Sequence, residues 1–278
     1  MGPLILLLIS LLAPPAVTPA ALLEACASGT PGEVQAILAK GANVNAVGED
    51  GETALLVAAR RGQADLLKIL LAAGANLAAR RWNGETALHA AAGSGHPAAL
   101  ALLLSRGLDV NATENRRGQT ALHYAAAEGR TPMVAQLLAA GAKVDAPSLS
   151  GVSPLWLAAQ GGHDEAAATL LGAKADPSAA GPEGYRPIHL AARACRPATI
   201  TALLAARADS NARTTAGSTA LHLAAAQNCL PAVQALAAAG ADLDAKDARS
   251  QTALDQARRR RFKEITEFLE QKASPSKP

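Results

Sequence analysis

A glycine that returns at a nearly constant interval is the feature that most constrains the fold of this chain. The intervals between successive glycines are 33, 34, 33, 33 and 33 residues, and one more step of 33 reaches Ser250. These glycines are Gly51, Gly84, Gly118, Gly151, Gly184 and Gly217. A period of roughly 20 to 50 residues marks a repeat architecture, in which no unit buries its apolar face without its neighbours. The chain is therefore predicted to be a stack of similar units instead of one globular core.

The residues that follow each glycine also repeat. Typical examples are Glu85-Thr86-Ala87-Leu88-His89 and Ser218-Thr219-Ala220-Leu221-His222. Ala-Ala follows in most units, then a turn, then Leu-Leu, and then Gly-Ala-Asx-hydrophobic-Asx-Ala. This pattern resembles the ankyrin repeat over about residues 21–272. The resemblance implies an all-α repeat solenoid of about seven to eight stacked units, each a helix-turn-helix with a projecting β-hairpin. The units are expected near 21–50, 51–83, 84–117, 118–150, 151–183, 184–216, 217–249 and 250–272.

Composition agrees with thin, closely stacked helices. Half of the residues are hydrophobic, yet only 2% are aromatic, so the core is built from alanine and leucine. The formal net charge of +3 is modest and gives no indication of nucleic acid as a partner.

Two positions of the repeat set the helix ends. A Thr or Ser is placed to cap the first helix of most units, namely Thr53, Thr86, Thr120, Ser153, Thr219 and Thr252. Glycine is favoured where the backbone turns left-handed after each helix. Cys195 and Asn228 replace it between paired helices, and Lys174 and Arg207 replace it after the second helices. We therefore expect the two units 151–183 and 184–216 to be the least stable in the interior of the stack.

The first twenty residues differ from the rest. Residues 1–20 hold no charged side chain, the segment from Leu4 to Leu12 is apolar except for Ser10, and small residues precede a cleavage site after Ala20. This pattern is typical of a secretory signal peptide, although its n-region lacks a Lys or Arg. The alternative is a disordered or misassigned start. Residues 273–278 are expected to be a disordered tail.

The histidines are predicted to form neither a metal site nor a catalytic site. Four of them, His89, His123, His189 and His222, share one repeat position, where the resemblance implies a ring that ties one unit to the next. None has a short metal-ligand spacing to another His or Cys. No phosphate loop, serine elbow or paired carboxylate motif is present, so we predict no catalytic residue, no cofactor and no metal.

Three cysteines cannot form a complete disulfide framework. Cys195 and Cys229 lie in neighbouring inter-helix turns, offset by one position, and export would permit a bond between them. Equivalent positions of stacked helices are about 10 Å apart, beyond the usual Cα separation of a disulfide, so we expect no bond. Cys26 is expected to be a buried small hydrophobe. Asn111-Ala112-Thr113 is a formal glycosylation acceptor but is interpreted as part of its hairpin.

The residues that the repeat does not dictate carry the functional prediction. In ankyrin proteins such residues lie at hairpin tips and on the concave side of the first helices. The predicted partner-binding residues are Arg60, Arg61, Arg80, Arg81, Trp82, Arg116, Arg117 and, further along, Tyr185. Trp and Arg are the side chains most enriched in interface hot spots, and an exposed hairpin Trp has little structural purpose. The alternative is that the arginines only solubilise the surface and that Trp82 packs on its neighbour.

The resemblance implies non-catalytic recognition of a partner protein, and the arginines favour an acidic one. We expect a monomer in the periplasm or outside the cell, acting as an inhibitor, immunity or accessory protein, as exported bacterial ankyrin proteins are thought to do. A scaffold anchored to the membrane by an uncleaved segment 1–20 is one alternative, and an effector acting on host proteins is another.

Overall fold

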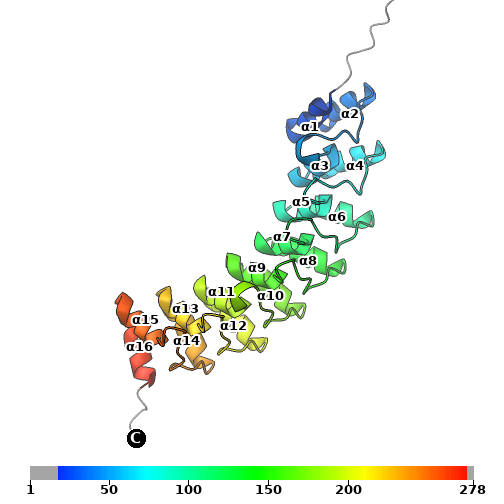
Figure 1. The fold of residues 1–278 in the computed structure, drawn as a ribbon. Helices are drawn as coiled ribbons and strands as arrows, with labels where there is room; N and C mark the ends of the chain where they lie inside the picture. The colour runs from blue at the N-terminus through cyan, green and yellow to red at the C-terminus, as the bar shows by residue number, and fades with distance from the viewer. Residues whose placement is uncertain (1–17, 274–278) are drawn as a thin grey trace, which may run out of the picture.

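The computed structural model describes residues 18–273 as a curved stack of helix pairs (Figure 1). Within this range the odd-numbered helices line the concave side of the arc and the even-numbered helices line its convex side. The pairs are α1 (Pro19–Ser28) and α2 (Pro31–Ala39), α3 (Ala54–Arg61) and α4 (Ala64–Ala72), α5 (Ala87–Ser94) and α6 (Pro97–Ser105), α7 (Ala121–Ala127) and α8 (Thr131–Ala139), α9 (Pro154–Gly161) and α10 (Asp164–Gly172), α11 (Pro187–Arg193) and α12 (Pro197–Ala205), α13 (Ala220–Ala226) and α14 (Leu230–Ala238), and α15 (Ala253–Arg260) and α16 (Lys263–Ala273). Eight pairs confirm the predicted solenoid.

Alanine and leucine form one continuous core through the stack. Ala58, Ala91, Ala125 and Ala158 are fully buried, and leucines such as Leu100 fill the space between the two helix layers. A methyl side chain at these positions lets adjacent helices approach closely, which explains how a core forms with so few aromatic rings.

The loops between the helix pairs are hairpins held mostly by turns. Three isolated antiparallel bridges occur among the described residues, namely Val47 with Thr53, Arg80 with Thr86, and Thr113 with Thr120. At the next hairpin Pro147 stands at the corresponding position and has no N–H to donate. The β character expected of every hairpin is thus limited to the first three.

Successive hairpins are joined by backbone hydrogen bonds between their tips. The N–H of Trp82 donates to Asp50 at 3.0 Å, that of Asn115 to Asn83 at 2.7 Å, and that of Leu149 to Arg117 at 2.7 Å. The same link recurs from Thr215 to Glu183 and from Ala248 to Ala216. It is missing between the α8–α9 and α10–α11 hairpins, where Pro182 occupies the donor position.

Buried histidines tie four of the helix pairs to the hairpin that leads into the following pair, as predicted. The Nδ1 of His89 accepts the N–H of Thr86 and lies 2.8 Å from its Oγ1, while Nε2 lies 3.0 Å from the Gln119 carbonyl oxygen of the following unit. Because a carbonyl only accepts, Nε2 carries the proton and donates it. His123 and His222 repeat the arrangement. In the fifth unit Trp156 replaces histidine and donates from Nε1 to the Tyr185 carbonyl.

The threonine caps differ in part from the prediction. Ser153 and Thr252 accept the N–H three residues later. The hydroxyls of Thr86, Thr120 and Thr219 instead bond to a histidine ring. The hydroxyl donates to Nδ1, which is unprotonated because the neutral imidazole carries its proton on Nε2. Thr53 has no histidine partner, and its buried hydroxyl has no hydrogen bond.

The residues that replace glycine at the expected turn positions have a left-handed backbone conformation. Lys174 and Arg207 have φ angles of 70° and 69°, and Cys195 and Asn228 have 53° and 56°. Side chains at such angles are strained, since only glycine adopts them freely.

Cys195 and Cys229 are joined by a disulfide, so the prediction of two free thiols was wrong. Their Cα atoms are 5.6 Å apart, within the range of disulfides. The spacing of about 10 Å applies to equivalent positions of stacked units, and the one-residue offset turns Cys229 back toward Cys195. Cys26 is a buried free thiol, as predicted, and burial raises its pKa to about 11.

Asn111 contributes a further inter-unit tie. Its Oδ1 accepts the N–H of Lys143 at 2.8 Å, and its Nδ2 donates to the carbonyl of Gly141. Both ends of the side-chain amide are thus hydrogen-bonded to the next unit, in agreement with its interpretation as a hairpin residue.

Most of the predicted signal segment, residues 1–17, and most of the predicted tail, residues 274–278, lie outside the described residues. Thr18 caps α1, which begins at Pro19 and so includes two residues before the predicted cleavage site. No helix between residues 18 and 273 has the length and apolar character needed to cross a membrane.

Candidate partner-binding site

Trp82 is at the tip of the α4–α5 hairpin and 72% of its surface is exposed. Its ring lies against Gly51 of the preceding hairpin, where a Cβ would come within 2.5 Å of the Trp82 Cδ1. Gly51 therefore leaves room for the indole, while most of the ring faces solvent. The alternative in which Trp82 packs on its neighbour accounts for only one edge of the ring.

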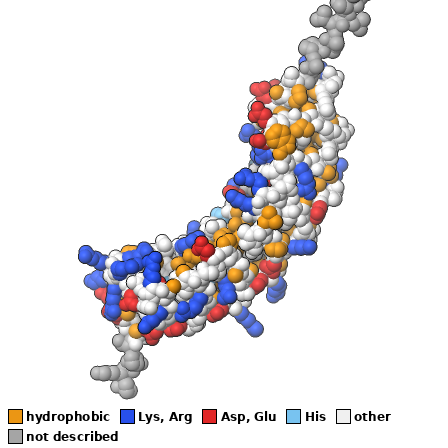
Figure 2. Space-filling view, viewed as in Figure 1, with side chains coloured by type: hydrophobic (Ala, Val, Ile, Leu, Met, Phe, Trp, Pro, Cys, Tyr) orange, Lys and Arg blue, Asp and Glu red, His pale blue; other side chains and the backbone are white. Residues whose placement is uncertain are grey.

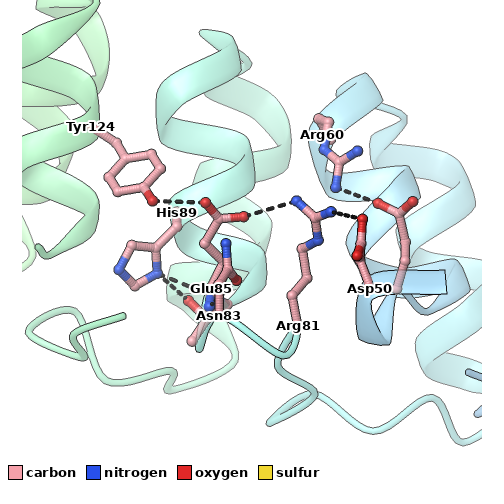
Figure 3. A network of polar contacts seen from close by, with 9 residues as sticks. Asp50, Arg60, Arg81, Asn83, Glu85, His89 and Tyr124 are labelled. Atoms are coloured by element: carbon pink, nitrogen blue, oxygen red, sulfur yellow. Dashed lines mark hydrogen bonds and ion pairs between the residues drawn. The ribbon is translucent and has the colours of Figure 1, made fainter. Parts of the chain in front are cut away.

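Arg81, next to Trp82, is held in a network of side chains on the concave side (Figure 3). Its guanidinium pairs with Glu85 at 3.2 Å and with Asp50 of the preceding hairpin at 3.5 Å. The hydroxyl of Tyr124, from α7, donates to the other oxygen of Glu85 at 2.7 Å. Burial opposes ionisation of Glu85, but hydrogen bonds from Tyr124, Asn83 and Arg81 outweigh it and hold its pKa below the ordinary value.

Arg60 is also paired, with Glu52 at the start of its own unit. Arg60 and Arg81 were both predicted to face the partner, but each has its charge matched within the chain. They shape the surface and contribute little net positive charge to it.

Arg116 and Arg117 present their side chains to solvent from the α6–α7 hairpin. Neither forms an ion pair with any residue between 18 and 273. Their backbone is fixed by the buried carboxylate of Glu114, which accepts the N–H groups of Arg116, Arg117 and Gln119 at 2.6, 2.7 and 3.0 Å. Burial raises the pKa of Glu114 less than these three bonds lower it, so its pKa lies below the usual range.

A pocket of about 240 Å³ opens between this hairpin and the concave helices. Its lining residues are Asn83, Glu85, Glu114, Arg116, Arg117, Gln119, Tyr124, Ala127 and Glu128. The pocket combines Arg116 and Arg117 from the hairpin with Tyr124 and Glu128 from α7 and its C-terminal end. Sequence analysis missed Tyr124 and Glu128; the signal for Tyr124 was an aromatic side chain at a position where the other full units carry alanine, valine, leucine or glutamine.

The remaining predicted residues are distributed more widely. Arg61 is exposed at the end of α3. Arg80 donates to the carbonyls of Gly84 and Thr113 and thereby links two hairpins. Tyr185 lies farther along the stack beside α11, with the guanidinium carbon of Arg193 5.2 Å from its ring centre. Tyr185 is therefore not part of the surface around Trp82.

No group of three or more His, Cys, Asp or Glu side chains suited to hold a metal ion occurs among residues 18–273. Basic and acidic side chains are interspersed over the face of the stack shown in Figure 2, and some of those on the concave side, such as Arg81 and Glu85, pair with each other.

Comparisons with known proteins agree on the architecture. The family model described as "Ankyrin repeats (3 copies)" matches residues 22–114, 111–181 and 188–277. The chain is similar to the crystal structure of the human ASB11 ankyrin repeat domain, with a TM-score of 0.73 and 29% identity. That match covers 81% of this chain and 100% of the other. A search of curated protein sequences found no match.

Proposed function

This chain belongs to the ankyrin-repeat family, whose repeats are generally protein–protein interaction modules, and from that premise we propose that it captures an acidic segment of a partner protein beside Trp82. The contact surface consists of Trp82 at one hairpin tip, Arg116 and Arg117 on the next hairpin, and the pocket that these two arginines line together with α7. In this proposal the chain acts as an inhibitor, immunity or accessory protein and performs no chemistry on its partner.

The observation that carries this proposal is which of the arginines have an ion-pair partner within the chain. Arg60 and Arg81 are matched by acidic neighbours, whereas Arg116 and Arg117 project without an internal ion pair in the described chain. Two such guanidiniums on the hairpin next to an indole that is 72% exposed combine two side-chain types enriched in hot spots. The hairpins are already ordered by their tip-to-tip hydrogen bonds, so binding orders little of the chain.

The test is affinity capture with three versions of the full chain. Trp82→Ala combined with Arg116→Glu and Arg117→Glu is expected to abolish partner capture while the circular dichroism spectrum stays unchanged. Arg81 is left intact because its ion pairs support the hairpin. Arg259→Glu with Arg261→Glu is the matched control, since it makes the same charge change at exposed arginines in the last unit. Equal capture by all three proteins would refute the proposed surface.

We also propose that the protein works in the periplasm or outside the cell. The Cys195–Cys229 disulfide supports this compartment, because such bonds persist in oxidising environments. The apolar segment 1–20 supports it as well. Mass analysis of the mature protein is expected to give a chain that starts at Ala21, and a chain that retains residues 1–20 would favour the membrane-anchored alternative.

A further inference from the structure

Leu149 has the same structural position as Trp82, two hairpins farther along the stack. The N–H of each donates to the residue before a repeat glycine, Asp50 for Trp82 and Arg117 for Leu149. Each side chain also covers that glycine, since a Cβ on Gly118 would come within 2.8 Å of the Leu149 Cγ. Leu149 is 76% exposed. The row of hairpin tips thus carries two exposed apolar side chains with one hairpin between them.

The hairpin between them is the one with the extra residue. Asn115 takes the position that Trp82 and Leu149 hold in their hairpins, as its N–H donates to Asn83. Arg116 and Arg117 follow it, and Glu114 fixes the backbone of both. Along the edge of the stack the order is therefore apolar, basic, apolar.

In the pocket below this hairpin two guanidiniums have no ion-pair partner among the described residues, whereas two of the three carboxylates already accept hydrogen bonds. Glu114 accepts three backbone N–H groups, and Glu85 accepts from Tyr124 and Arg81. Both carboxylates are thus satisfied within the chain. Glu128 is the exposed carboxylate on the pocket wall, which also carries the guanidiniums of Arg116 and Arg117. A ligand carboxylate can be held by the guanidinium forks of Arg116 and Arg117, which suit that group.

We propose that the α6–α7 hairpin pocket receives an Asp or Glu side chain from an extended partner segment whose flanking apolar residues contact Trp82 and Leu149. This inference rests on the proposed function and specifies the residue types of the partner segment that is bound. Adjacent units are about 10 Å apart, so the two apolar contacts lie about 20 Å apart. A segment in the extended polyproline II conformation advances about 3.1 Å per residue with three residues per turn, so about six residues span the two contacts and every third side chain faces the stack. The recognised segment therefore reads apolar, two residues, acidic, two residues, apolar.

The experiment selects binding peptides from a random twelve-residue library, displayed on phage, with the full chain and two variants as separate targets. The full chain is expected to enrich peptides with a central Asp or Glu and apolar residues about three positions to each side. Arg116→Gln with Arg117→Gln is expected to lose the acidic preference and keep the apolar ones. Trp82→Ala with Leu149→Ala is expected to lose the apolar preferences and keep the acidic one. No consensus on the full chain, or the same consensus on all three proteins, overturns the proposal.

An enriched peptide then gives a quantitative check by fluorescence anisotropy. Replacing its acidic residue by the amide is expected to weaken binding about tenfold to the full chain and to leave binding to the Arg116→Gln, Arg117→Gln variant unchanged. Equal weakening on both proteins overturns the pocket assignment. If partner capture depends on Arg116 and Arg117 but the peptide shows no such coupling, the surface is right and the recognised motif is wrong. If capture is also independent of them, the proposed function fails first.

Discussion

The side chain of Cys195 faces Cys229 because the four preceding junctions of the stack, from Gly62 to Gly162, bring the same two positions together. The left-handed residue of one inter-helix turn points at the residue one position later in the next turn. A Cβ on Gly62 would lie 2.3 Å from the ring of His96, and one on Gly162 would lie 2.4 Å from Arg196. Glycine is required at those junctions, whereas at this junction the two side chains are cysteines and the close approach becomes a covalent bond.

Loss of the disulfide is expected to destabilise the C-terminal units. The bond closes a loop with a sequence separation of 34, for which loop entropy predicts a contribution of up to about 4 kcal/mol. Urea unfolding with and without a phosphine reductant measures the effect, with hydrogen exchange in α12 and α14 reporting its location. Cys195→Gly with Cys229→Ser is the control, and its unfolding should not respond to the reductant. An unchanged urea midpoint of the wild-type protein after reduction would contradict the prediction.

The fold could be predicted from the sequence because the repeat encodes it redundantly. Most units repeat the same caps, turn glycines and histidine ties, so an exception such as Arg186 or Trp156 does not obscure the pattern. The disulfide could not be predicted, since it depends on how far a one-residue offset rotates a side chain between neighbouring turns. Spacing between equivalent residues carries no information on that rotation.

The site was predicted less well, and the reason is electrostatic. Sequence position identified Trp82, Arg116 and Arg117 as residues outside the repeat pattern. It could not show that Arg81 is matched by Asp50, 31 residues earlier, because that pairing exists only once the units stack. Tyr124 was missed for the same reason, since its partner Glu85 is 39 residues away.

The strained left-handed residues predict a pair of opposite stability changes. Lys174→Gly is expected to stabilise the protein by about 0.5–1 kcal/mol, because glycine adopts a φ of 70° without strain but loses more chain entropy on folding. Gly141→Lys is the matched reverse, since Gly141 has a φ of 87° and open space around it. It should destabilise by about 1 kcal/mol. Urea unfolding checks both signs, and two changes in the same direction would contradict the argument.

Removal of the Tyr124 hydroxyl is expected to loosen the network around the pocket. Tyr124→Phe deletes a hydrogen bond to the ionised Glu85, and for this half-buried pair we expect a loss of about 1 kcal/mol in the free energy of unfolding. Tyr185→Phe is the matched control, because the Tyr185 hydroxyl makes no hydrogen bond with residues 18–273. In a double-mutant cycle Glu85→Gln and Tyr124→Phe should be less than additive. Full additivity would show that the two side chains act independently.

The buried histidines predict a loss of stability as the pH falls below about 6.5. Burial lowers the pKa of His89, His123 and His189 from the ordinary value of 6.5, so the folded chain keeps them neutral. As the pH falls, the unfolded chain binds protons at a higher pH than the folded chain does. The stabilising effect of the neutral histidines is therefore complete above pH 6.5 and is lost as the pH falls through the folded pKa values. Each histidine contributes a slope of at most about 1.4 kcal/mol per pH unit.

This slope is measured by urea unfolding between about pH 7.5 and 5.5. Carboxylates interfere little in this window, because the pKa values of Glu114 and Asp247 lie below their ordinary values of 4.5 and 3.8. His123→Asn removes one of the three titrating rings and should flatten the slope while lowering stability at pH 7.5. Since each ring ties two units together through its Nε2–H, protonation in the unfolded chain competes with stacking itself. A stability that stays constant over this range would mean that the rings do not govern it.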